Sequence, residues 1–258
     1  MRKYYSILLL LMFVATDLSA QSTDSAVVSN SFFQGMDTSD YNRICASYNP
    51  VWIGWNEPKR NKVKEFPLNH SLSLGYLHAS NIAKNSPLYI EYGANVQYSF
   101  GEKRVTEGDG QLESRYTYTA QMLSINLPVN VAMRFELKSK TGKSKFVTPY
   151  IGVNLRYGAW GNIKLERGYL IAFGPGYAGG TKWTRTYRLF DDSDDSLAMG
   201  DKAFDRFQVG INFGAGFTYD KLYLGLGCVA DIMKIINSQE TGYVGRFNTV
   251  TISVGIAF

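Results

Sequence analysis

Apolar residues alternate with small or polar residues in eight segments of this chain, the period expected of half-buried β-strands. The segments span residues 42–55, 68–79, 87–100, 115–137, 146–160, 203–219, 221–233 and 247–258. The last is the most regular, because one of its faces carries only Val250, Ile252, Val254, Ile256 and Phe258. Pro50 and Pro128 fall inside predicted strands and cannot donate to a ladder, so we expect a bend at the first and a bulge at the second.

The connections between these segments alternate between short and long. Short turns are expected near residues 80–86, 138–146 and 219–221, and long loops near 56–66, 101–114, 161–202 and 234–246. Outer-membrane barrels have short periplasmic turns and longer extracellular loops. The pattern therefore predicts an all-β fold: an eight-stranded antiparallel up-and-down transmembrane β-barrel over residues 42–258, with both ends on the periplasmic side.

The N-terminus has the pattern of a cleavable signal peptide over residues 1–20. Arg2 and Lys3 precede a short apolar run, and small residues lead to a cleavage site after Ala20. Residues 21–41 would then form an N-terminal periplasmic segment. A soluble lipocalin-type barrel also alternates, with its apolar residues inside. The export signal and the terminal Phe258 favour lipid outside, in the outer membrane of a Gram-negative bacterium.

Three segments carry a resemblance to a known family: Pro87-Leu88-Tyr89-Ile90-Glu91-Tyr92-Gly93, Leu123-Ser124-Ile125-Asn126-Leu127-Pro128-Val129 and Thr148-Pro149-Tyr150-Ile151-Gly152-Val153. In their order and spacing they resemble the PorT-like outer-membrane β-barrel proteins of Bacteroidetes. The resemblance covers residues 42–258 and implies an eight-stranded outer-membrane barrel. Members of that family have diverse roles, some tied to protein secretion, and the resemblance supplies no catalytic residues.

Polar residues on the predicted inward face suggest either an ion path or a hydrogen-bonded plug. The interior of an eight-stranded barrel is just wide enough for side chains to fill, and buried charges must pair. We therefore expect a plug, a barrel-interior polar network of Glu91, Arg134, Glu136, Arg156, Gln208, Asn212 and Asp231. Inward glycines would make room for these side chains or permit strong curvature of the sheet.

Residues 163–173 and 181–190 flank the glycine-rich stretch Gly174–Gly180, which we interpret as a turn, and could pair as an extracellular hairpin. Its aromatic residues Tyr169, Trp183 and Tyr187 are then candidates for contact with a partner or glycan, or else they pack on the barrel rim. The acidic run Asp191–Asp195 could hold Ca²⁺, but it lacks the glycine and distal glutamate of an EF-hand loop. A solvated loop tip is the expected state.

The composition and the spacing of single residues mainly argue against other functions. The net charge of +5 is scattered rather than gathered into a stripe, which argues against binding of nucleic acid. His70 and His78 are too far apart along one strand to share a metal, Cys45 and Cys228 are expected on opposite faces as free thiols, and no nucleophile motif is present. We expect no catalytic, cofactor or metal site.

These exclusions leave a non-enzymatic barrel in outer-membrane lipid. It would present extracellular loops or serve as a subunit of an envelope or secretion assembly, in contact with other envelope proteins. A narrow channel for small solutes is the alternative. The sequence does not indicate an oligomeric state.

Overall fold

The computed structural model describes residues 39–56, 68–82, 86–108, 112–137, 144–173, 176–190, 204–233, 236–237 and 244–258. The predicted signal peptide and residues 21–38 of the predicted periplasmic segment lie outside these ranges. In chain order the strands are β1 (Tyr41–Tyr48), β2 (Val51–Asn56), β3 (His70–Asn81), β4 (Leu88–Gly108), β5 (Leu112–Met133), β6 (Phe135–Glu136), β7 (Lys145–Phe173), β8 (Gly176–Arg188), β9 (Phe207–Tyr219), β10 (Leu222–Asp231), β11 (Ile236–Asn237) and β12 (Val244–Ala257). No helix among the described residues is long and apolar enough to cross a membrane.

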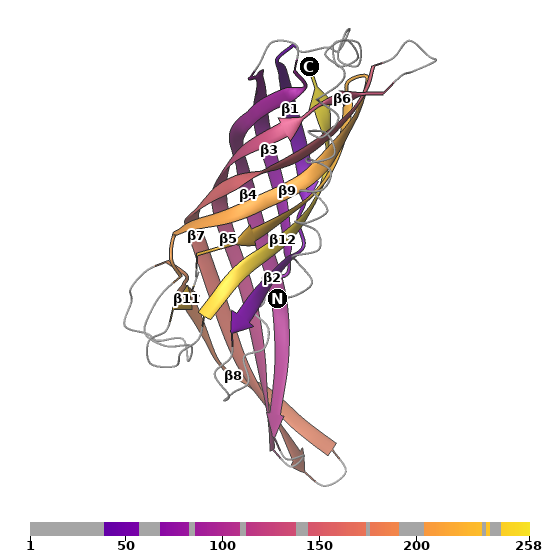
Figure 1. The fold of residues 1–258 in the computed structure, drawn as a ribbon. Coiled ribbons are helices and arrows are strands. Elements are labelled where there is room, and N and C mark those ends of the chain that lie inside the picture. Colours follow the sequence, from indigo (N-terminus) through magenta and orange to yellow (C-terminus); the bar gives the residue numbers. More distant parts are fainter. Residues whose placement is uncertain are drawn as a thin grey trace.

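Eight strands close into an antiparallel ring, β1-β3-β4-β5-β7-β9-β10-β12, because β12 also pairs with β1 (Figure 1). Neighbours in the ring are neighbours in the sequence, so the predicted eight-stranded up-and-down barrel is confirmed. The expected bend at Pro50 is present as the break between β1 and β2, both of which pair with β12. The amide of Val250 donates to the Pro50 carbonyl at 3.1 Å, which keeps the two strands aligned across the break.

An apolar band surrounds the outside of the ring. On β3 the outward residues Leu72, Leu74 and Tyr76 are 54%, 63% and 48% exposed, and the other strands repeat this pattern. His70 and His78 lie at the ends of this row and are hydrogen-bonded to polar neighbours, Tyr48 and Asn42. Their eight-residue separation is roughly 26 Å along the strand, or about 20 Å in height at a tilt of ~40°, which fits an apolar band of about 25 Å. Exposure of so large an apolar surface to water is unfavourable, so the band faces lipid.

One end of the barrel holds the short connections, and Figure 1 shows the C-terminus at this end. The amide of Asn42 donates to the Phe258 carbonyl at 2.7 Å, so the beginning of β1 and the end of β12 meet there. The β9–β10 turn at the same end places Asp220 at φ 56°, a left-handed conformation that Asp tolerates better than most residues. Nearby, the Asn81 amide donates to the exposed Asp40 carboxylate and lowers the pKa of that group. By the alternation of short turns and long loops, this is the periplasmic end.

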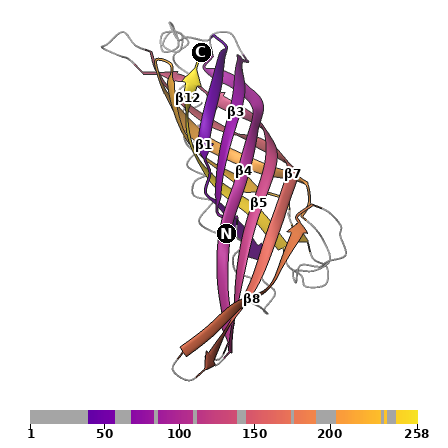
Figure 2. The same ribbon diagram turned by 180° about the vertical axis from the view of Figure 1, so that it is seen from behind.

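At the opposite end, four strands continue well beyond the ring (Figures 1 and 2). Here β4 pairs with β5 as far as Gly108, β5 with β7 as far as Ile171, and β7 with β8 as far as Phe173. We call this four-stranded extension the projecting sheet. The predicted hairpin between residues 163–173 and 181–190 is confirmed, but much of the predicted loops 101–114 and 161–202 is strand. The prediction failed there because both faces of the projecting sheet carry polar residues, so the apolar alternation disappears while the extended backbone continues.

The expected bulge at Pro128 is wrong. The β4–β5 register is the same on both sides of Pro128, and only the rungs opposite residues 127–128 are absent. The bulge lies instead at Ala159, where the β5–β7 register changes from Leu123↔Trp160 to Ser124↔Gly158. A proline at an inward position can thus be accommodated by omitting ladder bonds rather than by inserting a residue.

We expect the purified protein to migrate faster on SDS gels when unheated than after boiling, because a closed ring has no free strand from which unfolding can start at low temperature. Densitometry of the two bands against temperature measures the transition. A protein that extracts into buffer without detergent and shows no mobility shift would contradict the transmembrane barrel.

Candidate functional site: a closed lumen and a projecting sheet

The periplasmic half of the lumen is organised around one buried carboxylate, Glu91. Its side chain is fully buried and accepts hydrogen bonds from the Tyr41 hydroxyl at 2.6 Å and the Asn130 amide at 3.2 Å. The Arg43 guanidinium forms an ion pair with it at 3.3 Å and lies over the Tyr223 ring at 4.1 Å. Two strands, β1 and β5, thus supply donors to one carboxylate on β4, which offsets the cost of taking its charge out of water.

A second ion pair lies in the extracellular half of the lumen. Arg156 on β7 contacts Asp231 on β10 at 2.6 Å, with side chains that are only 4% and 1% exposed. Arg156 also donates to Gln208 at 3.4 Å and to the Asn126 side-chain oxygen at 3.1 Å. The remaining Asp231 oxygen, Oδ1, accepts no hydrogen bond from the described residues.

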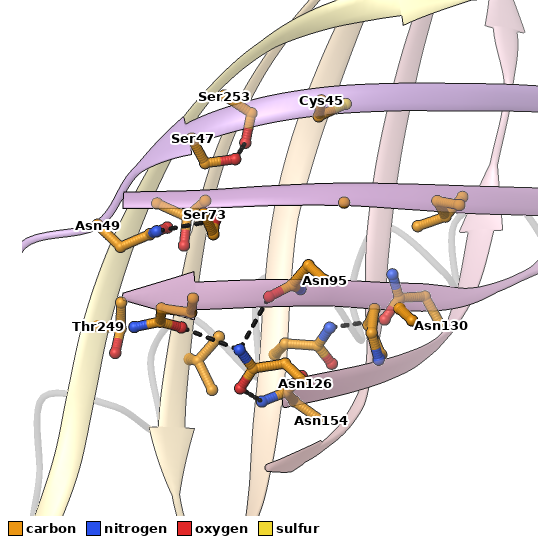
Figure 3. A pocket seen from close by; sticks show the side chains of 18 of the residues that line it. Cys45, Ser47, Asn49, Ser73, Asn95, Asn126, Asn130, Asn154, Thr249 and Ser253 are labelled. Carbon is orange, nitrogen blue, oxygen red and sulfur yellow. Dashed lines mark hydrogen bonds between the residues drawn. The ribbon is translucent and has the colours of Figure 1, made fainter. Parts of the chain in front are cut away.

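Asparagine side chains extend each ion pair to neighbouring strands of the lumen (Figure 3). Beside Arg156, Asn126 accepts from Arg156 and Asn154 and donates to Asn95. Beside Glu91, Asn130 donates to the carboxylate and accepts from Asn212. Amides suit these positions because each offers both donors and an acceptor to the next strand. The hydrogen bonds thus form two polar clusters, one around Glu91 and one around the Arg156–Asp231 pair.

The lumen contains a cavity of about 140 Å³, and a cluster of buried apolar residues lies toward each end of the barrel. The periplasmic cluster is Tyr41, Ala79, Tyr89 and Ala132, with Leu77 and Tyr150 packed against it. The extracellular cluster is Val51, Leu68, Ala120, Met122, Ile163, Leu189, Phe190, Phe204 and Phe247. A cavity of this volume with polar side chains in its lining can hold several ordered water molecules.

Inward glycines serve both of the purposes that the sequence left open. A Cβ at Gly214 or Gly227 would lie 2.5 or 2.3 Å from the Tyr150 hydroxyl, so these two make room for a side chain. A Cβ at Gly93 or Gly152 would instead lie 2.1 Å from a carbonyl oxygen of the adjacent strand. Those positions permit the close backbone approach that a small, strongly curved ring requires.

The structure places five of the seven predicted interior residues deep in the lumen: Glu91, Arg156, Gln208, Asn212 and Asp231. Arg134 lies at the periplasmic end, with its guanidinium over the rings of Phe146 at 3.7 Å and Tyr41 at 4.6 Å. Glu136 is a correction, because it is exposed. It pairs with the buried Phe146 but occupies the last rung before the turn, where the lumen opens to water.

Sequence reasoning missed Arg43, Asn126 and Asn130. Arg43 lies two residues before Cys45, which is predicted to face inward, so the same alternation places Arg43 in the lumen with Glu91. Asn126 and Asn130 alternate with the outward residues Ile125 and Val129, and the same signal places them in the lumen.

The projecting sheet carries aromatic residues on the face that continues the lumen. Its register aligns Tyr116 with Arg167 and Trp183, and Tyr118 with Leu165 and Arg185. Tyr187 lies beside the buried Ile163 near the rim, whereas Tyr169, at 36% exposed, lies farther out. The three predicted contact residues thus share one face. Tyr187 and Trp183 are half-buried and Tyr169 is exposed.

Cations lie among these rings. The Arg167 guanidinium is 5.3 Å from the Tyr116 ring centroid, and that of Arg185 is 5.6 Å from the Trp183 ring. The opposite face holds threonines and charged residues, including the exposed Glu102–Arg104 ion pair. We call the first face the aromatic face. It combines aromatic rings with arginine side chains.

No group of three or more His, Cys, Asp or Glu side chains that could hold a metal occurs among the described residues. Cys45 and Cys228 are both free thiols. Residues 191–195, the acidic run, lie outside the described part of the chain, as do Gly174 and Pro175. The rest of the glycine-rich stretch, Gly176–Gly180, is strand rather than turn.

Neither a family model nor a curated protein matches this chain. Among solved structures, the chain is similar to Neisserial surface protein A, at 11% identity over 85% of this chain and 97% of that one, with a TM-score of 0.37. It is also similar to Ail of Yersinia pestis, solved with the heparin analogue sucrose octasulfate, at 10% identity over 85% and 99% of the two chains and a TM-score of 0.28. The N-terminal barrel of Pseudomonas aeruginosa OprF matches at 8% identity over 83% and 97%, with a TM-score of 0.23.

Removal of one partner of the Arg156–Asp231 pair should destabilise the barrel strongly. We expect Arg156→Met to lower the free energy of unfolding by about 3–5 kcal/mol, because it leaves a buried carboxylate unpaired. The double variant with Asp231→Leu should recover much of that loss. Urea unfolding in detergent micelles, followed by tryptophan fluorescence, measures both. A single variant as stable as the wild type would show that the pair does not organise the lumen.

Proposed function

We propose that this protein is a non-enzymatic barrel of the outer membrane of a Gram-negative bacterium, exported by a cleavable signal peptide, whose projecting sheet is an extracellular recognition surface. The observation that carries the proposal is the position of that sheet. Its four strands extend past the apolar band, and its aromatic face holds Tyr169, Trp183 and Tyr187 together with Arg167 and Arg185.

The change in outward residues supports placement of the sheet outside the membrane. On β4 the outward register changes from Val96 and Tyr98 to Glu102 and Arg104 within a few residues. On β7 it changes from Tyr157 and Trp160 to Lys164, which pairs with Glu166. Charged side chains on the lipid face are costly near the bilayer centre, so this line marks the outer interface.

The architecture also supports recognition rather than catalysis or transport. Rigid strands hold the aromatic side chains in place, and Trp, Tyr and Arg are the residues that dominate binding energy in protein interfaces. The resemblance to PorT-like barrels is consistent with a partner in the cell envelope. A partner that stays bound through purification in mild detergent would make this barrel a subunit of an envelope or secretion assembly.

A narrow channel is the second function that the fold allows, and the lumen argues against it. Two buried ion pairs, the amides beside them and two apolar clusters occupy the lumen. Ions crossing such a lumen would have to separate paired, desolvated charges.

We therefore expect the wild-type protein to give no steady conductance in planar bilayers. Glu91→Ala removes the carboxylate that gathers Tyr41, Arg43 and Asn130, and it should produce flickering openings that the wild type lacks. Steady, long-lived conductance of the unaltered protein would overturn the closed lumen.

The recognition surface can be tested by photocrosslinking on intact cells. We expect a photoreactive phenylalanine analogue at Trp183, on the aromatic face, to give discrete adducts with extracellular or envelope macromolecules. The same analogue at Thr186, on the opposite face of the same strand, should give few. Equal labelling from both positions, or none from Trp183 in cells where the sheet is accessible to an impermeant biotin reagent, would contradict a role for the aromatic face.

A further inference from the structure

The projecting sheet has two open edges, because the ring no longer closes it. Beyond His70↔Phe100, β4 pairs only with β5, and β8 pairs only with β7, over the described residues. In the ring below, the place beside β7 belongs to β9. Figure 2 shows the sheet with β8 along one of its sides. Each edge presents a row of backbone N–H and C=O groups without a neighbouring strand.

The β4 edge has the residues that natural sheets use to prevent further pairing. Between Gly101 and Gly108 it carries Glu102, Lys103, Arg104 and Glu107, with both signs of charge represented. Arg104 and Glu102 form an exposed ion pair at 2.7 Å. Charged side chains on an edge disfavour addition of another strand, so this edge is protected.

The β8 edge differs in that its charges have one sign. The segment Trp183–Arg188 reads Trp-Thr-Arg-Thr-Tyr-Arg, in which aromatic residues and threonines have high β-propensity. It contains no proline and no acidic residue, and its two charges, Arg185 and Arg188, are both positive. Of two edges on one small sheet, one carries both signs of charge and the other carries only positive charge.

We propose that the β8 edge at Trp183–Arg188 binds an extended acidic segment of another polypeptide, which adds to the projecting sheet as a fifth strand. This deepens the proposed function, on which it rests, by naming the partner as an acidic polypeptide that binds along the edge. Main-chain hydrogen bonds supply affinity in this mode, and side chains on alternate positions supply specificity.

The sign of the charge selects the partner. Two copies of the β8 edge would bring arginines opposite arginines, which destabilises a strand pair, whereas an acidic strand would place carboxylates there. Arg185 is exposed and lies over the Trp183 ring, so its guanidinium is held near the edge and available to a carboxylate. Thr184 and Thr186, exposed on the opposite face, offer hydroxyls to the alternate side chains of the same strand.

Three labelled peptides test the proposal on the full-length protein in lipid nanodiscs, with fluorescence anisotropy as the readout. The first alternates glutamate with threonine or valine over ten residues. The second replaces each glutamate with lysine, and the third keeps glutamate but has its central backbone nitrogens methylated. We expect the first to bind at least tenfold more tightly than either control, because only it combines negative charge with free backbone donors.

Charge reversal on the two edges provides the matched variants. Arg185→Glu should lower affinity for the glutamate peptide at least fivefold and raise affinity for the lysine peptide, whereas Arg104→Glu on β4 should change neither. The unheated gel band verifies that both variants retain the barrel. Equal binding of the methylated peptide, no preference for glutamate, or equal effects of the two variants would each overturn strand addition. Such a failure is distinct from failure of the recognition surface, which the crosslinking from Trp183 tests on its own.

Discussion

The rest of the structure depends on one constraint: backbone N–H and C=O groups in hydrocarbon have no water to bond with, so a sheet in the membrane must close on itself. The β1–β12 pairing achieves this closure, and Asn42 and Phe258 exchange hydrogen bonds at the point where the two ends of the ring meet. Closure fixes the register of every strand. Register in turn decides which residues of each strand face lipid and which face the lumen.

Closure with eight strands produces a lumen too small to hold bulk water and too large to leave empty. The chain fills it with side chains that satisfy one another, and this explains why the two ion pairs are embedded in amides and hydroxyls rather than isolated. Tyr41, Arg43 and Asn130 together surround Glu91, so that this charge does not rely on a single partner. The glycines opposite Tyr150 follow from the same constraint, because a small ring can hold a large side chain only where the facing strand has none.

The sequence was sufficient to predict the barrel because period-two alternation follows directly from lipid on one side and a filled lumen on the other. It identified Glu91 and Arg156 as interior residues but missed Arg43 and placed Glu136 inside, because parity says which way a side chain points and not how far along the lumen it lies. The projecting strands were predicted mostly as loops for a related reason. Outside the membrane both faces of a sheet are polar, and Thr117 and Tyr118 then alternate without the apolar contrast that marks a transmembrane strand.

Above the membrane the requirement for closure ends, and the sheet opens. Water can satisfy an exposed edge there, so a strand such as β8 can stand beside β7 without a second neighbour. An open edge is a hazard unless charged side chains discourage pairing, and the two edges meet this need differently. The mixed charges of β4 oppose any added strand, whereas the arginines of β8 discourage pairing with an identical edge and leave the backbone available to a strand of opposite charge. The barrel, closed in lipid where no strand edge can stay unpaired, thus anchors a sheet whose β8 edge pairs with no further strand of the described residues.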